Sequence, residues 1–192
     1  MGIRDNIRDF FQQQGSEQSK AYNNFPNNQI VFPFNTDIGF FSGVDQMNPE
    51  GNSAALACLN VLGTAFSEAP LEVYEQSGDG EEKILNHPAA MLMRKPSPYL
   101  SGNLLNNYII TSVSVAGDAF LLKLKNEAGG VVQLYPLIPE QVEVKGTKEE
   151  LITHYEYKQK GQNLYIPRED MIHIREKIDP RNHRRGLAPL RS

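Results

Sequence analysis

The sequence predicts an α+β fold in which short helices pack on a mostly antiparallel sheet, preceded by an extended N-terminal arm. Three observations lead to this prediction. Apolar residues recur at helical spacing between residues 53 and 69. After residue 117, β-branched and aromatic segments alternate with glycine-containing turns, as in antiparallel strands. Residues 12–51 are rich in Gln, Asn, Ser, Gly and Pro, a composition too polar to fold alone.

The composition limits the classes of protein to consider. With 192 residues, 40% apolar and 22% charged, the chain has the composition of one soluble globular domain. A formal net charge of -4 argues against a protein that coats DNA, because phosphate binding needs a clustered basic excess. The single cysteine excludes an internal disulfide and is typical of a reducing compartment. No secretory signal or apolar run of about 20 residues is present, so we expect no membrane partner.

The N-terminal 51 residues form two expected units. Residues 1–11 predict an amphipathic helix, because Ile3, Ile7 and Phe10 fall on one face. Its polar charges balance, which favours docking on a neighbouring subunit or domain over a membrane surface. Residues 12–51 are interpreted as an extended arm that becomes ordered against a partner. The α+β domain itself is expected over residues 52–192.

The first elements of that domain are predicted from caps and prolines. Asn52 or Ser53 caps a helix that Pro70 ends. Two strands follow around the turn at residues 77–80, and His87-Pro88 opens a short helix that closes before Pro96. The expected buried positions of the first helix are Ala55, Leu59, Leu62, Phe66 and Ala69.

The second half reads as one helix and then strands. Residues 101–115 suit either a helix or a strand, and Ser101 as a cap favours the helix, which Gly117 ends. Residues 119–125 and 131–137 predict a hairpin whose second strand lies at an edge, since Pro136 cannot donate to a ladder. Further strands are expected at residues 142–144, 152–157, 163–166 and 171–175.

The sequence predicts no catalytic, cofactor-binding or metal site. Cys58 lies in an apolar helix, where cysteine commonly behaves as a small buried hydrophobe. The four histidines lack the spacing of a metal site, and His173 is expected to pack or hydrogen-bond at a sheet face. The glycine pairs match no phosphate-binding loop.

One concentrated basic patch stands out in this acidic chain. It consists of Arg181, His183, Arg184 and Arg185. Such a patch suits contact with a nucleic-acid backbone or an acidic partner. A solvated loop between a strand and a helix is the more ordinary interpretation of the same residues.

Six short phrases, taken together, indicate a family. None carries chemistry, and each is a backbone or packing device. They are ACLNVLGTAFSEAPL (57–71), HP (87–88), GDAFL (117–121), LYPLIP (134–139), DMIHI (170–174) and GLAPL (186–190). Their order and spacing resemble the N-terminal half of tailed-phage portal proteins of the HK97 type, from about Asn52 to the end. Lys95-Pro96-Ser97 and Ala188 depart from the family pattern, at turn positions.

The resemblance implies a structural, non-enzymatic subunit of a ring, commonly dodecameric, at one vertex of an icosahedral capsid. Implied partners are other copies of the chain, the terminase large subunit, the major capsid protein, a head–tail adaptor and double-stranded DNA passing through without sequence-specific recognition. The implied locations are the virion and, during assembly, the host cytoplasm. Residues 52–192 correspond to the peripheral wing, and the family's stem and clip follow the last phrase. We therefore expect a truncated portal.

Two other classes stay open from the sequence alone. Another small phage structural component, such as a head–tail adaptor, can be this small and α+β, but would not carry these phrases in this order. A small cysteine hydrolase would depend on Cys58.

Overall fold

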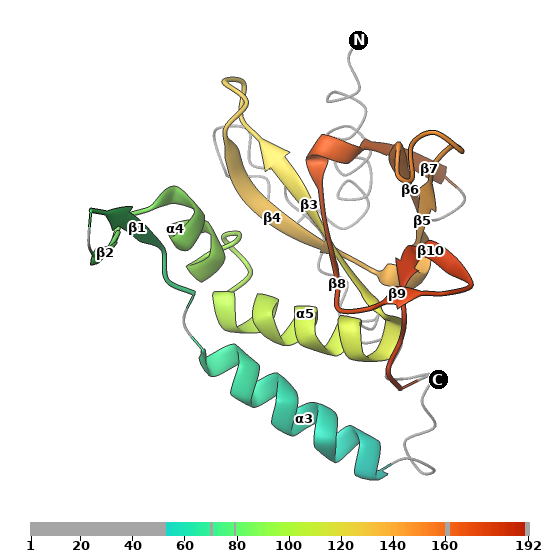
Figure 1. The fold of residues 1–192 in the computed structure, drawn as a ribbon, viewed down its shortest axis with the longest axis horizontal. Helices are drawn as coiled ribbons and strands as arrows, with labels where there is room; N and C mark the ends of the chain where they lie inside the picture. Colours follow the sequence, from blue (N-terminus) through green and yellow to red (C-terminus); the bar gives the residue numbers. More distant parts are fainter. Residues whose placement is uncertain (1–52, 70, 79, 160–161, 191–192) are drawn as a thin grey trace, which may run out of the picture.

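The computed structural model describes residues 53–69, 71–78, 80–159 and 162–190. The helix expected over residues 1–11 and the arm expected over 12–51 lie outside the described residues (Figure 1). The domain boundaries therefore stay predictions.

All three predicted helices of the α+β domain are confirmed. They are α3 (Ser53–Glu68), α4 (Pro88–Arg94) and α5 (Gly102–Ala116). His87 caps α4, with its Nδ1 accepting from the Ala89 amide at 3.2 Å, and Ser101 caps α5 by accepting from the Leu104 amide at 3.3 Å. Gly117 ends α5 with a φ of +83°, a left-handed conformation that favours glycine.

The described strands form four small sheets, all antiparallel. In the three-stranded sheets the order is β4-β3-β8 and β5-β6-β7, and β1-β2 and β9-β10 are two-stranded. Pro136 lies in the edge strand β4, as predicted. The strands are β1 (Tyr74–Ser77), β2 (Gly80–Lys83), β3 (Asp118–Lys125), β4 (Val131–Leu137), β5 (Val142–Lys145), β6 (His154–Gln159), β7 (Gln162–Pro167), β8 (Met171–Arg175), β9 (Ile178–Asp179) and β10 (Asn182–Gly186).

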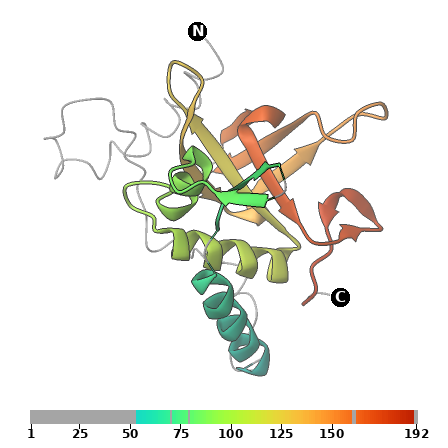
Figure 2. The same ribbon diagram turned by 60° about the vertical axis from the view of Figure 1, so that its left-hand side comes forward.

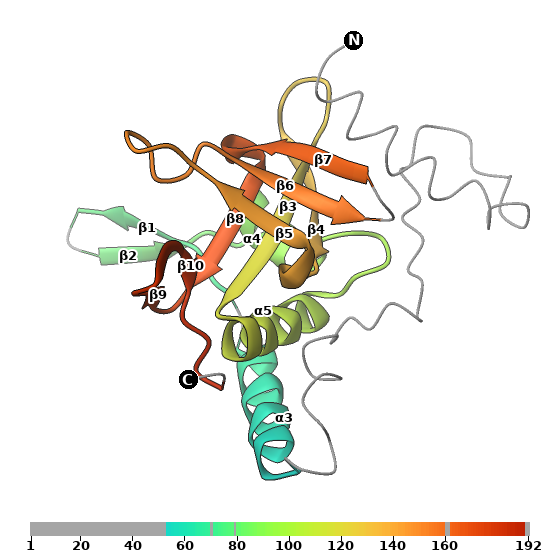
Figure 3. The ribbon, with the colours of Figure 1, turned by 90° about the vertical axis from the view of Figure 1, so that its right-hand side faces the viewer.

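Strand β3 is the centre of the molecule. Ala119 and Leu121 point to the side of α5 and join the core that includes Leu105 and Tyr108. The alternate residues of β3 point the other way, to the sheet β5-β6-β7, so both faces of the strand are buried. Figures 1 and 3 show the resulting order of layers: α3, α5, the sheet around β3, and the sheet β5-β6-β7.

The buried face of α3 differs from the prediction. Leu59 and Gly63 are buried, but Leu62 and Phe66 are 50% and 43% exposed, and the expected small hydrophobe Cys58 is also exposed. The reason is that α3 packs mainly on α5 within the described chain, so only a narrow stripe is covered. Figures 1 and 2 show α3 as the outermost helix.

Two strand assignments also differ. Strands β1 and β2 lie closer to their turn than the apolar residues 71, 73, 84 and 85 suggested. Strands β9 and β10 were not predicted, because residues 178–186 lack apolar alternation; the expected loop around Arg184 is in fact a short hairpin.

Among the described residues, no helix combines the length and apolarity needed to cross a bilayer.

Candidate functional site

Asp118 is the centre of a buried polar cluster in the described chain. Its carboxylate is fully buried at the start of β3. Oδ1 accepts from His173 Nε2 on β8 and from the Gly186 amide on β10, each at 2.7 Å. Arg185 Nε lies 2.6 Å from Oδ2 as an ion pair. Asp118 therefore joins three segments that lie far apart in the sequence, and we call this cluster the Asp118 junction.

Arg185 extends the junction to the second sheet. Its Nη1 donates to the carbonyl oxygen of Val142 at 2.8 Å, at the start of β5. Its guanidinium carbon lies 5.4 Å from the centre of the Phe120 ring, within reach of a cation–π interaction. His173 stacks on the same ring with centroids 4.3 Å apart. The aromatic ring and the carboxylate thus hold the side chains of Arg185 and His173 in place.

Two glycines permit the close approach of β10 to the end of α5. A Cβ on Gly186 would lie 1.9 Å from the carbonyl oxygen of Gly117, and a Cβ on Gly117 would lie 2.4 Å from that of Gly186. Any side chain at Gly186 would force the two backbones apart. The Leu190 amide then donates to the Ser114 carbonyl oxygen at 3.3 Å, which keeps the C-terminal segment against α5.

Asp118, His173 and Tyr155 follow one another as in a catalytic hydrogen-bond relay. The Tyr155 hydroxyl lies 3.4 Å from His173 Nδ1, and His173 Nε2 donates to Asp118. Burial raises the pKa of Tyr155, which opposes its ionisation. The His173 side chain is only 6% exposed and that of Asp118 is not exposed, so a substrate has little access. The contacts of the cluster join β3, β8 and β10.

His173 fulfils its prediction, since it hydrogen-bonds at a sheet face. Asp118 and the junction as a whole were missed. The sequence did contain an indication, because Asp118 stands directly before the apolar run 119–122. A carboxylate at the start of a buried strand needs a partner for its charge.

The predicted basic patch is divided by the structure. Arg185 points inward to the junction. Arg184 donates to the carbonyl oxygens of Leu151 at 2.9 Å and Thr147 at 3.3 Å. Arg181 and His183 are exposed. Two of the four side chains thus brace the fold, and two face solvent.

Cysteine and metal chemistry find no support in the part of the chain that the structure describes. No described hydrogen bond joins Cys58, exposed on α3, to a histidine. Nor do three or more His, Cys, Asp or Glu side chains gather there as a metal site would require.

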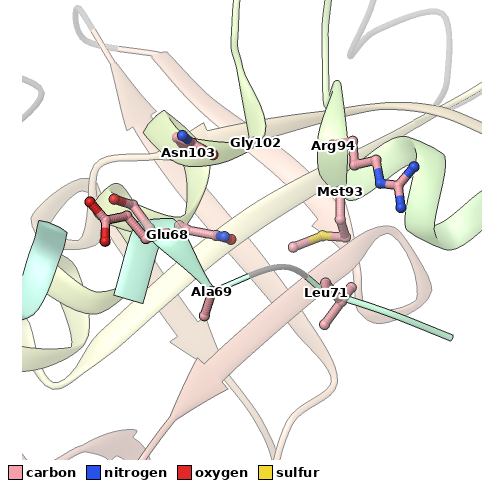
Figure 4. Close-up of a pocket in the computed structure, with 9 residues that line it drawn as sticks. Glu68, Ala69, Leu71, Met93, Arg94, Gly102 and Asn103 are labelled. Atoms are coloured by element: carbon pink, nitrogen blue, oxygen red, sulfur yellow. The ribbon is translucent and has the colours of Figure 1, made fainter. Parts of the chain in front are cut away.

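A cavity of about 180 Å³ lies away from the junction, between the end of α3 and the start of α5 (Figure 4). Glu68 and Arg94 flank it from opposite sides, and Met93 and Leu71 supply apolar lining. Ser67 also lines it, and its hydroxyl donates to the carbonyl oxygen of Thr64 at 2.9 Å.

Comparison with known proteins gives a consistent family. A family model described as phage portal protein matches residues 53–192. The chain is 25% identical over 126 residues to the portal protein of Enterobacteria phage HK97, covering 64% of this chain and 29% of that protein.

Solved structures share the fold. A chain from the virion of a native gene transfer agent particle aligns with a TM-score of 0.63 at 18% identity, covering 78% of this chain and 39% of that one. A chain from the neck of the empty particle, computed with C6 symmetry, gives 0.66 at 18% identity, covering 76% and 39%. A chain from the neck of the native particle, computed with C12 symmetry, gives 0.63 at 17% identity, covering 79% and 39%.

The chain thus spans 29% of the length of the curated relative and 39% of each of these solved chains.

Proposed function

The chain belongs to the phage portal protein family, and from that membership we propose that it is a structural subunit of a portal ring. The ring would occupy one vertex of a phage capsid, form the conduit for DNA packaging and ejection, and connect head to tail. The observation that carries the proposal is the continuous family match over residues 53–192, which includes every described element.

The Asp118 junction supports a mechanical role. Three of the phrases that resemble the family, at residues 117–121, 170–174 and 186–190, meet at this one buried cluster. The Asp118 junction fixes the C-terminal segment relative to the sheets. A subunit that carries load between neighbours in a closed ring needs such fixed geometry.

The partners follow from the same proposal. We infer that the chain assembles with copies of itself, commonly twelve in this family, and that terminase, the major capsid protein and a head–tail adaptor contact the assembled ring. Chains that share this fold occur in particle necks computed with C6 and C12 symmetry, and this supports a ring. DNA would pass through without sequence-specific recognition, and the acidic net charge of -4 agrees with weak attraction for phosphates. The ring would belong to the virion after assembly in the host cytoplasm.

A non-enzymatic role is part of the proposal. The cysteine-hydrolase alternative has no support from the exposed setting of Cys58, and the adaptor alternative has no support from the family match.

Deletion of the reading frame from its phage genome tests the function. We expect capsids that contain no DNase-protected DNA, because without a portal the DNA has no entrance. Supplying the intact frame in trans should restore the protected DNA. Capsids that fill normally after the deletion would refute the proposal.

A further inference from the structure

The hairpin β1–β2 projects from the body and pairs with no further strand of the described chain. The residues of β2 are exposed along its whole length, and Tyr74 on β1 is 51% exposed. Neither strand pairs with any described strand except the other. An isolated two-stranded hairpin is at best marginally stable in water. Figure 1 shows that it lies at an extremity of the molecule.

The charges of this hairpin are unbalanced. Glu75 lies directly opposite Glu82 across the ladder, and Glu81 lies opposite the uncharged Gln76. Like charges in facing positions destabilise an antiparallel pair. The only basic residue of the two strands, Lys83, is already bonded to Glu72. The described part of the hairpin therefore lacks a cation that could relieve the repulsion between Glu75 and Glu82.

The opposite end of the molecule carries the complementary charge. Residues 175–185, which include β9 and β10, contain five arginines and lysines against two acidic residues. Arg181 is exposed, with no acidic side chain of the described chain within ion-pair distance. Lys177 is 61% exposed and has only a loose 4.0 Å contact to its neighbour Glu176. Figure 1 places this end and the hairpin at opposite ends of the longest axis.

Glu75 and Glu82 lie on one face of the hairpin, because they are direct partners across the ladder. Tyr74, the residue before Glu75 on β1, points to the other face. The acidic surface of the hairpin therefore consists of Glu75 and Glu82.

We propose that the β1–β2 hairpin of one copy docks on the β9–β10 end of the next copy, where Glu75 and Glu82 receive Arg181 and Lys177. This inference rests on the proposed ring. A second copy is the occupant that the charges favour, because both complementary surfaces occur on the same chain. Since they lie at opposite ends, each copy keeps one surface of each kind available, and the contact is head-to-tail. Such a contact propagates and closes into a ring if the rotation between copies permits.

Charge reversal on the two surfaces tests the contact. The hairpin variant is Glu75→Lys with Glu82→Lys, and the end variant is Lys177→Glu with Arg181→Glu. Each alone should associate about tenfold or more weakly by sedimentation velocity at low salt, because like charges then face each other. An equimolar mixture should recover association, since reversed hairpins meet reversed ends and the two variants alternate.

A matched control separates the loss of a specific contact from the effect of a changed net charge. Glu127→Lys with Glu169→Lys raises the net charge by as much as the hairpin variant does, at exposed sites outside both surfaces, and should leave association unchanged.

The outcomes distinguish this contact from the proposed function. Rings that persist unchanged in both reversal variants would overturn the contact and leave the portal proposal standing. Recovery of association in the mixture without any closed ring would support the contact and count against the ring. Wild-type protein that stays monomeric at all salt concentrations would overturn the contact, while the packaging experiment would still decide the function.

Discussion

At Asp118, a carboxylate without exposed surface receives two hydrogen bonds and one ion pair from residues 55 to 68 positions away. Its position after Gly117 places it where α5 turns into β3. Because a buried charge is tolerated only when it is paired, the three partners and the carboxylate depend on each other. At the residue scale, the fold is therefore most sensitive at this point.

We predict that Asp118→Asn lowers the free energy of unfolding by about 3 kcal/mol, because Arg185 would stay half-buried without its counter-charge. Urea unfolding followed by circular dichroism measures this. The exposed control Glu127→Gln should change stability by less than about 0.5 kcal/mol. Equal stability of the two variants would show that the junction does not stabilise the fold.

Gly186→Ala should destabilise the protein by about 2 kcal/mol or more, since its methyl group would lie 1.9 Å from a backbone oxygen that cannot rotate away. Gly80→Ala is the matched control, because no atom lies within 4 Å of a Cβ at that position. The same unfolding experiment compares them. A Gly186→Ala variant as stable as Gly80→Ala would contradict the close backbone approach.

At the element scale, the two three-stranded sheets and α5 surround the buried Tyr108 and Tyr157 and the partly buried Tyr135. Burial raises the pKa of Tyr135 to about 12, and it also raises the pKa values of Tyr108 and Tyr157 above their ordinary value near 10. The unfolded chain therefore loses these protons at lower pH than the folded chain does. Their contribution to stability is complete below pH 10 and is lost as the pH rises above it.

We predict that the free energy of unfolding falls steeply between pH 10 and 12, as measured by urea titration at a series of pH values. Tyr135→Phe should reduce the slope by up to about 1.4 kcal/mol per pH unit, because one ionising group is removed. Tyr165→Phe, at a tyrosine that is 46% exposed, should leave the slope unchanged. Identical slopes in wild type and Tyr135→Phe would contradict this account.

Elements were predictable where local chemistry determines them. Ser101 and His87 cap helices by short-range hydrogen bonds, and Gly117 ends α5 through its own backbone conformation. The buried face of α3 was not predictable, because Leu62 and Phe66 have the spacing of core residues. Whether they are covered depends on what packs beside the helix, which spacing does not encode.

At the scale of the whole molecule, the family resemblance acquires a physical explanation. The phrases around Asp118, His173 and Gly186 look unrelated in the sequence, yet they meet at one junction. Sequence order and turn chemistry could identify each phrase. Their convergence could not be predicted, because it depends on long-range packing of β3 between α5 and the second sheet.

The charge asymmetry along the longest axis is likewise a property of the whole molecule. The patch at residues 181–185 was recognisable in the sequence, but Arg184 and Arg185 serve the fold and only Arg181 and His183 stay exposed. The sequence could not distinguish the two groups, because Arg184 and Arg185 are held by backbone carbonyl oxygens from distant segments.

The central claim, that this chain is a subunit of a portal ring, is tested most directly by native mass together with negative-stain images of the product of the complete reading frame. We predict a closed ring of identical subunits with a central hole. A compact monomer or dimer under conditions that preserve assembly would contradict the claim.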